Sequence, residues 1–376
     1  EQIDGSENSF AIKKAFEQKY DVVVTYPPNL GILGADESLI NLKEVAKKDF
    51  AETKSNLATM FFSRTLDLLK PNGFTSLILK DSWMFMSRYE KMRDILFDNH
   101  SICSLAHLGR GVIPDQHQMN AVVIRNSHLP SFEARYCFTS NADIIDKQID
   151  ESADTLEEQY ILPKPKSFPS DNSRNVCNSL AKMSNVPTKP LSYWASEGLQ
   201  NAFSLGQPFK SSVATLPAGK NIDRDKFVRQ WWELNHHDLD SEQGNWKPII
   251  SGGEYRRWYG NINGYVNAKE PEIGHLNQQL ESKVNSWTAL APTFNAREVP
   301  SGAIYDASGP CFAPSNNMTD EQTRLFQLGL LNSSMFNRLV KTVYPAGVLG
   351  SIRPNALAVL PIVADEKAAI AATVAQ

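Results

Sequence analysis

The sequence has few cysteines, and their spacing argues against the usual sulfur-based sites. Four cysteines occur in 376 residues, and none belongs to a Cys-x-x-Cys pair (Cys103, Cys137, Cys177 and Cys311). Zinc sites and disulfide frameworks normally show characteristic cysteine spacings, so neither is expected here. The adjacent His236 and His237 would face opposite ways on a strand, so they do not indicate a metal site either. We expect the cysteines to be small, buried hydrophobic groups.

A long apolar run and an excess of basic residues are also missing. No stretch approaches the roughly 18 apolar residues of a membrane-spanning helix. The first residues, beginning Glu-Gln-Ile-Asp, have neither the basic start nor the apolar core of a signal peptide. We therefore expect a cytoplasmic protein without a membrane partner. Its 38 Lys and Arg against 42 Asp and Glu give a net charge of -4, so any nucleic-acid surface must be a local concentration of positive charge.

Residues 1–145 alternate between strand-like and helix-like segments, which predicts an α/β sheet with helical crossovers. The β-branched run from Asp21 to Thr25 predicts a strand buried on both faces. Apolar spacing and turn residues predict the other elements: a helix over 53–70, a turn at 71–73, a strand over 74–79, a helix around 89–96, and last two strands over 102–108 and 121–125.

The composition changes after residue 145. Residues 146–190 are rich in Asp, Glu, Ser, Lys and Pro, which predicts a linker or peripheral segment. Residues 191–376 are rich in Trp and Gly, with short strand-like pieces and one helix expected around 319–344, so they predict a second, α+β domain. The adjacent Trp231 and Trp232 are expected to be structural, because neighbouring tryptophans usually supply buried area.

Two prolines directly follow the first predicted strand, in the order Tyr26, Pro27, Pro28, Asn29. Prolines stiffen the carboxyl end of a strand, which is where open α/β sheets bind ligands. An amide oxygen and a backbone carbonyl accept hydrogen bonds from an exocyclic amine, and an aromatic ring stacks on a base. The segment therefore has the parts needed to hold an extruded nucleobase. A plain strand-to-loop turn is the alternative interpretation.

This segment resembles the Asn-Pro-Pro-Tyr motif of adenine-N6 DNA methyltransferases, with the two outer residues exchanged. Further segments, spread over nearly the whole chain, resemble the large methyltransferases of BREX phage-exclusion systems, the PglX type. They are residues 55–74, 81–93, 106–109, 225–233, 246–248, 252–260 and 328–337.

The resemblance implies a partial Rossmann-like, S-adenosylmethionine-dependent methyltransferase sheet (1–145), a linker (146–190) and a DNA target-recognition domain (191–376). It implies methyl transfer to N6 of adenine in double-stranded DNA, with the base flipped into a cleft between the sheet and the second domain. The product would mark host DNA for a phage-defence system whose other proteins are possible partners. The equivalent of Ser82 to Phe85 lines the base pocket in the family, although packing against the sheet is the favoured interpretation here.

Site residues follow from the same resemblance. Tyr26, Pro27, Pro28 and Asn29 would form the catalytic motif. Asp21 and Thr25, at the two ends of the strand before it, would contact the cofactor. Cations and glycines that suit phosphate contacts are expected to bind DNA: Arg229, Gly252, Gly253, Arg256, Arg257 and Lys341.

Two departures from the family pattern leave a second interpretation open. No Gly-rich cofactor loop precedes Asp21, and the exchange of Tyr26 and Asn29 moves the amide three positions along the chain. Because a misplacement of about 1 Å can cost roughly a hundredfold in rate, the alternative is a catalytically inactive DNA-binding or scaffold fragment of a phage-defence complex. An unrelated α/β binding protein with a chance Pro-Pro turn is a third alternative.

Overall fold

The computed structural model describes residues 13–32, 40–109, 118–138, 175–211, 213–215, 220–239, 244–262, 264–274, 279–288, 294–314, 321–343, 357–362 and 374. Two compact units divide the chain. Unit 1 comprises Glu1–Asn201 with Val343–Pro345, and unit 2 comprises Ala202–Thr342 with Ala346–Gln376. In the described part of the chain, no helix is long and apolar enough to cross a membrane.

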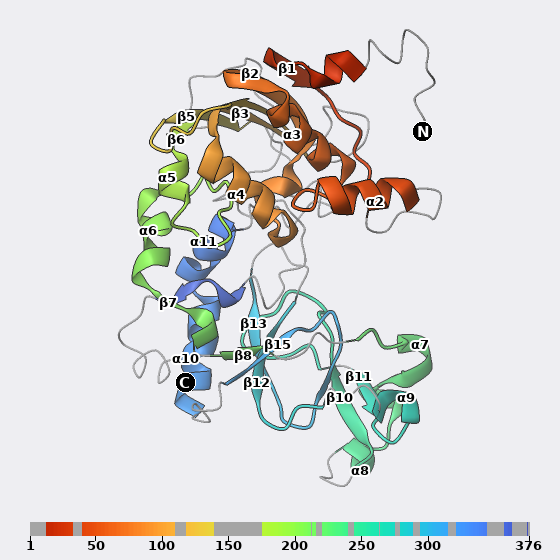
Figure 1. Ribbon diagram of the computed structural model, residues 1–376. Helices are drawn as coiled ribbons and strands as arrows, with labels where there is room; N and C mark the ends of the chain where they lie inside the picture. The colour runs from red at the N-terminus through yellow and green to blue at the C-terminus, as the bar shows by residue number, and fades with distance from the viewer. Residues whose placement is uncertain are drawn as a thin grey trace. The chain divides into compact units, whose positions relative to one another are not determined.

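Unit 1 is built on a six-stranded mixed sheet with the order β1-β2-β4-β3-β5-β6. β1 pairs in parallel with β2 and β3 with β5, whereas β4 runs antiparallel between β2 and β3. Figure 1 shows α3 and α4 along one face of this sheet. The strands are β1 (Tyr20–Thr25), β2 (Leu69–Lys80), β3 (Ser101–Gly109), β4 (Met119–Arg125), β5 (Ala134–Phe138) and β6 (Asn175–Asn178).

Two helices of unit 1, α3 and α5, begin at a side chain that caps them. Asn56 lies in extended conformation before α3, and its side chain accepts a hydrogen bond from the Ala58 amide, as an N-cap residue does. Ser179 caps α5 in the same way. The helical segments are α2 (Ile40–Asp49), α3 (Leu57–Asp67), η2 (Asp81–Met84), η3 (Ser87–Tyr89), α4 (Glu90–Asn99), α5 (Leu180–Met183) and α6 (Glu197–Leu205), the last of which contains the boundary between the units.

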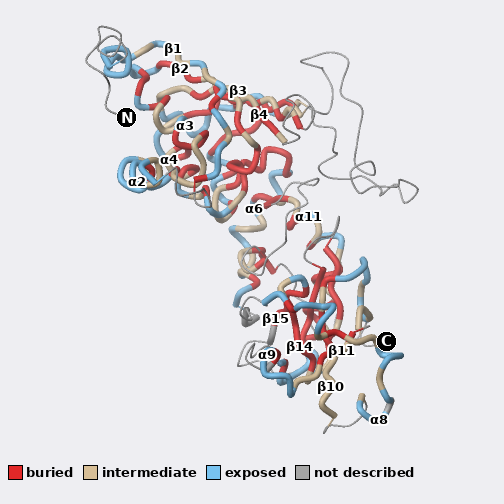
Figure 2. Tube along the Cα trace, turned by 90° about the vertical axis from the view of Figure 1, so that its right-hand side faces the viewer, coloured by how far each residue is buried: buried red, intermediate tan, exposed pale blue. Residues whose placement is uncertain are grey.

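Three expectations for unit 1 were wrong in detail. The strand at Asp21 to Thr25 is present but is not buried on both faces, because β1 is an edge strand: Val22 is 59% and Val24 73% exposed (Figure 2). The turn at 71–73 lies inside β2, where Asn72 adopts a φ of 63°. The predicted last two strands, β3 and β4, are followed by β5 and β6 in the same sheet.

Unit 2 contains two four-stranded sheets, β14-β10-β11-β9 and β13-β12-β15-β8, and a two-stranded pair, β16-β7. Neighbouring residues of β10 point to opposite faces of their sheet. Ile249 joins a core with Val228 and Val266, whereas Ile250 joins one with Val284 and Val299. The strands are β7 (Gln207–Pro208), β8 (Val213–Thr215), β9 (Val228–Gln230), β10 (Trp246–Ile250), β11 (Gly264–Asn267), β12 (Val284–Trp287), β13 (Ala296–Val299), β14 (Ile304–Tyr305), β15 (Cys311–Pro314) and β16 (Pro361–Ile362).

The helix expected around 319–344 is two helices, α10 and α11. The break lies at Ser333, whose side chain accepts a hydrogen bond from the Phe336 amide and so begins the second helix. The helical segments of unit 2 are η5 (Phe209–Ser211), α7 (Arg224–Phe227), η6 (Trp231–Glu233), α8 (His236–Leu239), α9 (Pro271–Gly274), α10 (Glu321–Asn332) and α11 (Ser334–Val343).

All four cysteines are free thiols, and their burial differs. Cys137 and Cys311 are buried, as expected, but Cys177 is exposed and Cys103 is half-buried. Cys177 lies on β6, the last strand in the order of the sheet, where one side chain in two points away from the core. The expectation of four buried cysteines was therefore wrong for these two.

Candidate functional site

The diproline corner lies at the carboxyl end of β1, at the edge of the unit 1 sheet. Pro27 is buried, whereas the Tyr26 side chain is 51% exposed. The chain after the corner is tied to the start of α3, because the Leu57 amide donates to the Leu30 carbonyl at 2.8 Å. The corner is thus held by backbone contacts, and Tyr26 points away from the protein interior.

Asn29 lies on a pocket beside this corner. The pocket is shallow and open to solvent, with a cavity volume of about 10 Å³, which is room for about one water molecule. The Asn56 amide donates to Asn29 Oδ1 at 2.8 Å, while Asn56 Oδ1 accepts from the Ala58 amide at 2.9 Å. The lining combines amide, hydroxyl and aromatic groups: Asn29, Asn56, Ala58, Thr59, Leu79, Lys80, Ser82, Trp83 and Tyr89.

The lining has amide and aromatic groups of the kind that contact a base, but it has no carboxylate for the ribose of S-adenosylmethionine. No Asp or Glu side chain is among the lining residues, although a carboxylate is the usual partner of a nucleoside's ribose hydroxyls. Asp21 lies outside the pocket, 80% exposed in its side chain and ion-paired with Lys70 at 2.8 Å. Thr25, at the other end of β1, is half-buried and does not line the pocket either. The described residues therefore do not fit the cofactor by themselves.

The far wall of the pocket is a turn held by a buried guanidinium. Arg93, fully buried on α4, donates to the carbonyls of Trp83 and Met86 at 2.8 Å and of Thr188 at 2.9 Å. Trp83, Met84 and Phe85 are at most 2% exposed, which confirms the packing interpretation of this segment. Ser82 and Trp83 nevertheless line the pocket, so packing and pocket formation are combined in one turn.

A buried polar cluster behind this turn was missed by the sequence analysis. His107 Nδ1 lies 3.0 Å from the Tyr193 hydroxyl, and His107 Nε2 lies 3.5 Å from Asp81 Oδ2. Tyr193 stacks on Tyr136 with ring centroids 4.7 Å apart. Burial raises the pKa of both tyrosines well above the ordinary value, so both phenols stay protonated. His107 and Tyr193 are 86 positions apart, so no local spacing in the sequence indicates this cluster.

In unit 2, the proposed DNA-contacting residues gather near one edge of the sheet β14-β10-β11-β9. β10 pairs in parallel with β14, and β9 and β10 are both antiparallel to β11. β9, β10 and β14 therefore run in the same direction, and the segments that follow them emerge at the same edge. The segment after β10 is the loop 251–261, which carries Gly252, Gly253, Arg256 and Arg257.

Backbone contacts hold this loop in one conformation. Gly253 and Gly260 have φ values of 67° and 106°, in the region that favours glycine, and Trp258 and Asn261 also have positive φ. A side chain at Gly252 would come within 2.8 Å of the Ser308 carbonyl oxygen. The Asn261 amide donates to the carbonyls of Gly252 and Glu254 at 3.0 and 2.7 Å. The two glycines singled out from the sequence are thus required by the backbone of the loop.

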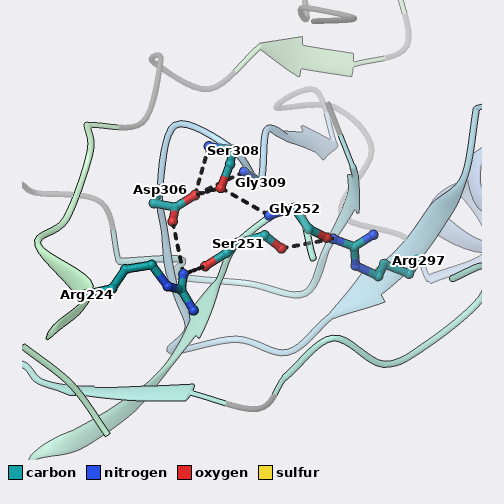
Figure 3. A network of polar contacts seen from close by, with 7 residues as sticks. All are labelled: Arg224, Ser251, Gly252, Arg297, Asp306, Ser308 and Gly309. Atoms are coloured by element: carbon teal, nitrogen blue, oxygen red, sulfur yellow. Dashed lines mark hydrogen bonds and ion pairs between the residues drawn. The ribbon is translucent and has the colours of Figure 1, made fainter. Parts of the chain in front are cut away.

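A buried arginine underlies the loop. Arg297 on β13 is fully buried and donates to the carbonyls of Ser251 and Gly252 at 3.1 and 2.7 Å (Figure 3). Burial lowers the pKa of its guanidinium to about 10. On the other side, Asp306 accepts from the amides of Ser308 and Gly309 and pairs with Arg224 at 3.7 Å. Arg224 also contacts the Ser251 hydroxyl. No local pattern in the sequence indicates Arg224, Arg297 or Asp306. They contact the loop and one another only in the folded chain.

The expected DNA-contacting cations differ in their surroundings. Arg256 is exposed and lies 3.6 Å from the exposed Glu254 carboxylate. Arg257 is half-buried, with its guanidinium over the Tyr255 ring at 5.5 Å from the centroid. Arg229 donates to the Val228 carbonyl at 2.9 Å. Lys341 lies in the last turn of α11, on a different element from the loop. The structure thus brings Gly252, Gly253, Arg256 and Arg257 together, with Arg229 on β9 of the same sheet.

Tryptophan exposure in unit 2 departs from expectation. Trp231 and Trp232 are 56% and 64% exposed, so the expectation that they are buried was wrong. They occupy the short helical turn η6 directly after β9, which leaves both indoles at the surface. Among the described residues, no group of three or more His, Cys, Asp or Glu side chains is placed to hold a metal ion.

The sequence is similar to a methylase family model and to curated methyltransferases. Residues 1–112 match the family model described as Eco57I restriction-modification methylase. The chain is 31% identical over 344 residues to the adenine-specific methyltransferase BrxX of Escherichia coli O9:H4 (strain HS), covering 87% of this chain and 27% of that protein. It is 25% identical over 373 residues to the adenine-specific methyltransferase PglX of Lacticaseibacillus casei (strain Zhang), covering 90% and 29%. The chain thus spans less than a third of the length of these curated relatives.

Two solved structures share the fold. The type IIL restriction-modification enzyme MmeI, solved in complex with DNA, superposes with a TM-score of 0.54 at 11% identity, over 92% of this chain and 47% of that one. A nuclease-deletion mutant of the type ISP restriction-modification enzyme LlaGI, with a DNA substrate mimic, gives 0.52 at 9% identity, over 100% and 36%. The α/β fold class expected from the sequence is confirmed, and so is the stated resemblance: this chain is homologous to a segment of the adenine-specific methyltransferases BrxX and PglX of the BREX type.

Proposed function

We propose that this chain is part of an enzyme that methylates N6 of adenine in double-stranded DNA with S-adenosylmethionine as the methyl donor, as the host-marking activity of a phage-defence system. In this proposal, residues 1–145 belong to the methyltransferase domain, residues 146–190 connect the domains, and residues 191–376 recognise DNA. Homology to methyltransferases named adenine-specific supports the reaction class. Two fold relatives solved with DNA or a DNA mimic support the ligand.

The observation that carries the proposal is the position of Asn29. The residue lies on a pocket at the carboxyl ends of β1 and β2, together with Ser82, Trp83 and Tyr89. An adenine in this pocket would meet amide and hydroxyl acceptors for its amine and aromatic side chains for its ring. In this proposal, Asn29 and the carbonyl of Pro27 would hold the adenine amine in place. Tyr26, at the outer position of the corner, would lie beside them.

One observation favours the inactive DNA-binding or scaffold fragment as a second candidate. The Asn29 oxygen already accepts a hydrogen bond from Asn56, and Tyr26 stands where the family has its amide. An amide oxygen retains a second lone pair for a substrate amine, so this contact weakens the enzymatic proposal without removing it.

The test is methyl transfer by the complete gene product, measured as tritium incorporated into unmethylated duplex DNA. We expect Asn29→Ala to lower incorporation at least a hundredfold, since it removes the orienting amide. Leu30→Ala is the matched control, because Leu30 is exposed and does not line the pocket. The double exchange Tyr26→Asn with Asn29→Tyr should raise incorporation. A wild-type protein that binds duplex DNA but incorporates no tritium would replace this proposal with the scaffold candidate.

A further inference from the structure

The most exposed tryptophans among the described residues form a pair at the turn after β9. Trp231 and Trp232 are 56% and 64% exposed, with ring centroids 5.6 Å apart and planes at 85°. The turn is held by a capping box in which the Gln230 amide donates to the Glu233 carboxylate at 2.6 Å. Two indoles are therefore presented to solvent on a backbone that is already ordered.

The register places this pair at the edge of the sheet that carries the 251–261 loop. Gln230 lies opposite Gly264 on β11, and Gly264 lies opposite Ile249 on β10. Trp231 is therefore level with the last residue of β10, directly before the loop. The loop adds further exposed rings: Tyr259 is 77% and Tyr255 43% exposed. Aromatic side chains thus predominate at this edge, on two segments that β11 separates.

Charges at the same edge are of both signs. Arg256 is near Glu254, Arg224 is near Asp306, and Glu233 belongs to the turn that carries the tryptophans. Such pairs reduce the attraction for phosphates, which requires unpaired cations. Exposed rings fit a nucleobase instead, because every base has a face that stacks on an aromatic side chain.

We propose that the pair Trp231–Trp232 is a stacking surface for an unpaired base of the DNA that unit 2 binds. The inference rests on the proposed function, because it takes DNA as the ligand of this edge. Extrusion of an adenine leaves its partner base unpaired, and a surface that stacks on an unpaired base lowers the cost of opening the pair. We therefore expect unit 2 to bind DNA with an opened base pair more tightly than fully paired DNA. Phosphate contacts add affinity for both forms, so they do not produce this preference.

The experiment compares two labelled duplexes of equal length by anisotropy titration of the full chain. One is perfectly paired, and in the other an abasic site replaces a single adenine and leaves the opposite thymine unpaired. We expect wild type to bind the second DNA about tenfold more tightly or better, in the range that a stacked base contributes. The double variant Trp231→Ala/Trp232→Ala should lose this preference and retain its affinity for the perfect duplex within about twofold. Phe132→Ala removes an exposed ring from unit 1 and is the matched control that keeps the preference.

The outcomes separate this inference from the proposed function. If the double variant keeps the full preference for the unpaired thymine, the stacking surface lies elsewhere and the inference is overturned while DNA binding stands. If wild type binds both DNAs equally, the inference is also overturned. A change in self-association of the double variant, with unaltered DNA binding, would show that the tryptophans form a protein contact instead. If neither DNA binds, the inference and the role of unit 2 in DNA recognition both fail.

Discussion

The pocket wall of unit 1 and the loop edge of unit 2 use the same device for different ends. In each, a fully buried arginine donates to main-chain carbonyls of an irregular segment: Arg93 to the turn 83–86, and Arg297 to residues 251 and 252. The held segment buries its aromatic ring in unit 1, where Trp83 is 1% exposed, and presents rings to solvent in unit 2, where Tyr259 is 77% exposed. In both places a buried guanidinium fixes the conformation of the main chain. The sequence of the held segment then decides whether its aromatic side chains are buried or exposed.

The comparison is most strongly tested by Arg93→Met. This substitution removes the guanidinium donor from three carbonyls, of which that of Trp83 is in a buried position and that of Met86 still accepts from the Tyr89 amide. Each group left unsatisfied costs about 1–3 kcal/mol. We expect the free energy of unfolding to fall by about 4 kcal/mol in urea titrations followed by far-UV circular dichroism. Arg88→Met, an exposed arginine of the preceding turn, is the control and should change it by less than about 0.5 kcal/mol. Equal effects of the two variants would show that Arg93 does not hold the turn.

A smaller and more local effect is expected from Arg297→Lys. One arm of the guanidinium, Nη2, donates to the carbonyls of Ser251 and Gly252, and the other arm, Nη1, donates to the side-chain oxygens of Thr288 and Asn295. An ammonium group is a single point donor, so it cannot replace both arms. We expect a loss of about 2 kcal/mol in stability and at least tenfold faster amide hydrogen exchange within 252–261. Arg256→Lys changes an exposed arginine of the same loop and should leave exchange unaltered. If amide hydrogen exchange within 252–261 stays slow in Arg297→Lys, Arg297 does not hold its loop in the way that Arg93 holds its turn.

The smallest expected effect is on the pH dependence of stability, and we expect it for a histidine of unit 1 and not for one of unit 2. Burial lowers the pKa of His100 below its ordinary value of 6.5; Asn126 and Asp67 raise it, and His128 lowers it further. The folded state then binds this proton less tightly than the unfolded state, so stability falls as the pH drops below about 6.5. We expect His100→Gln to make the fall in unfolding free energy between pH 7.5 and 5.5 shallower. His237→Gln, exposed in unit 2, should leave the slope unchanged, and an equal change in both variants would contradict the assignment.

Local pattern was sufficient for much of the fold and for the position of the corner. The capped apolar run that forms α3 and the β-branched run of β1 are set by neighbours in sequence, so their spacing predicts them. The prolines at 27 and 28 likewise end β1 through their own covalent structure. The pocket neighbours of Asn29 are different, because Ser82 and Tyr89 reach it only through the pairing of β1 with β2. Asn56 was detectable in principle, since an amide directly before an apolar helix is an N-cap signal.

Sequence alone determined the α/β class, the strand that leads into Tyr26–Asn29, the glycines of the 251–261 loop and the homology to adenine-specific methyltransferases. Tertiary structure decided which residues stand beside Asn29, that Val22 and Val24 lie on an exposed edge strand, that Trp231 and Trp232 face solvent, and that Arg93 and Arg297 are buried. The physical reason is the distance along the chain over which each kind of interaction acts. Backbone preferences and periodicity act over a few residues and are visible in the chain. Burial and hydrogen-bond partners depend on strand order and register, which join residues tens of positions apart.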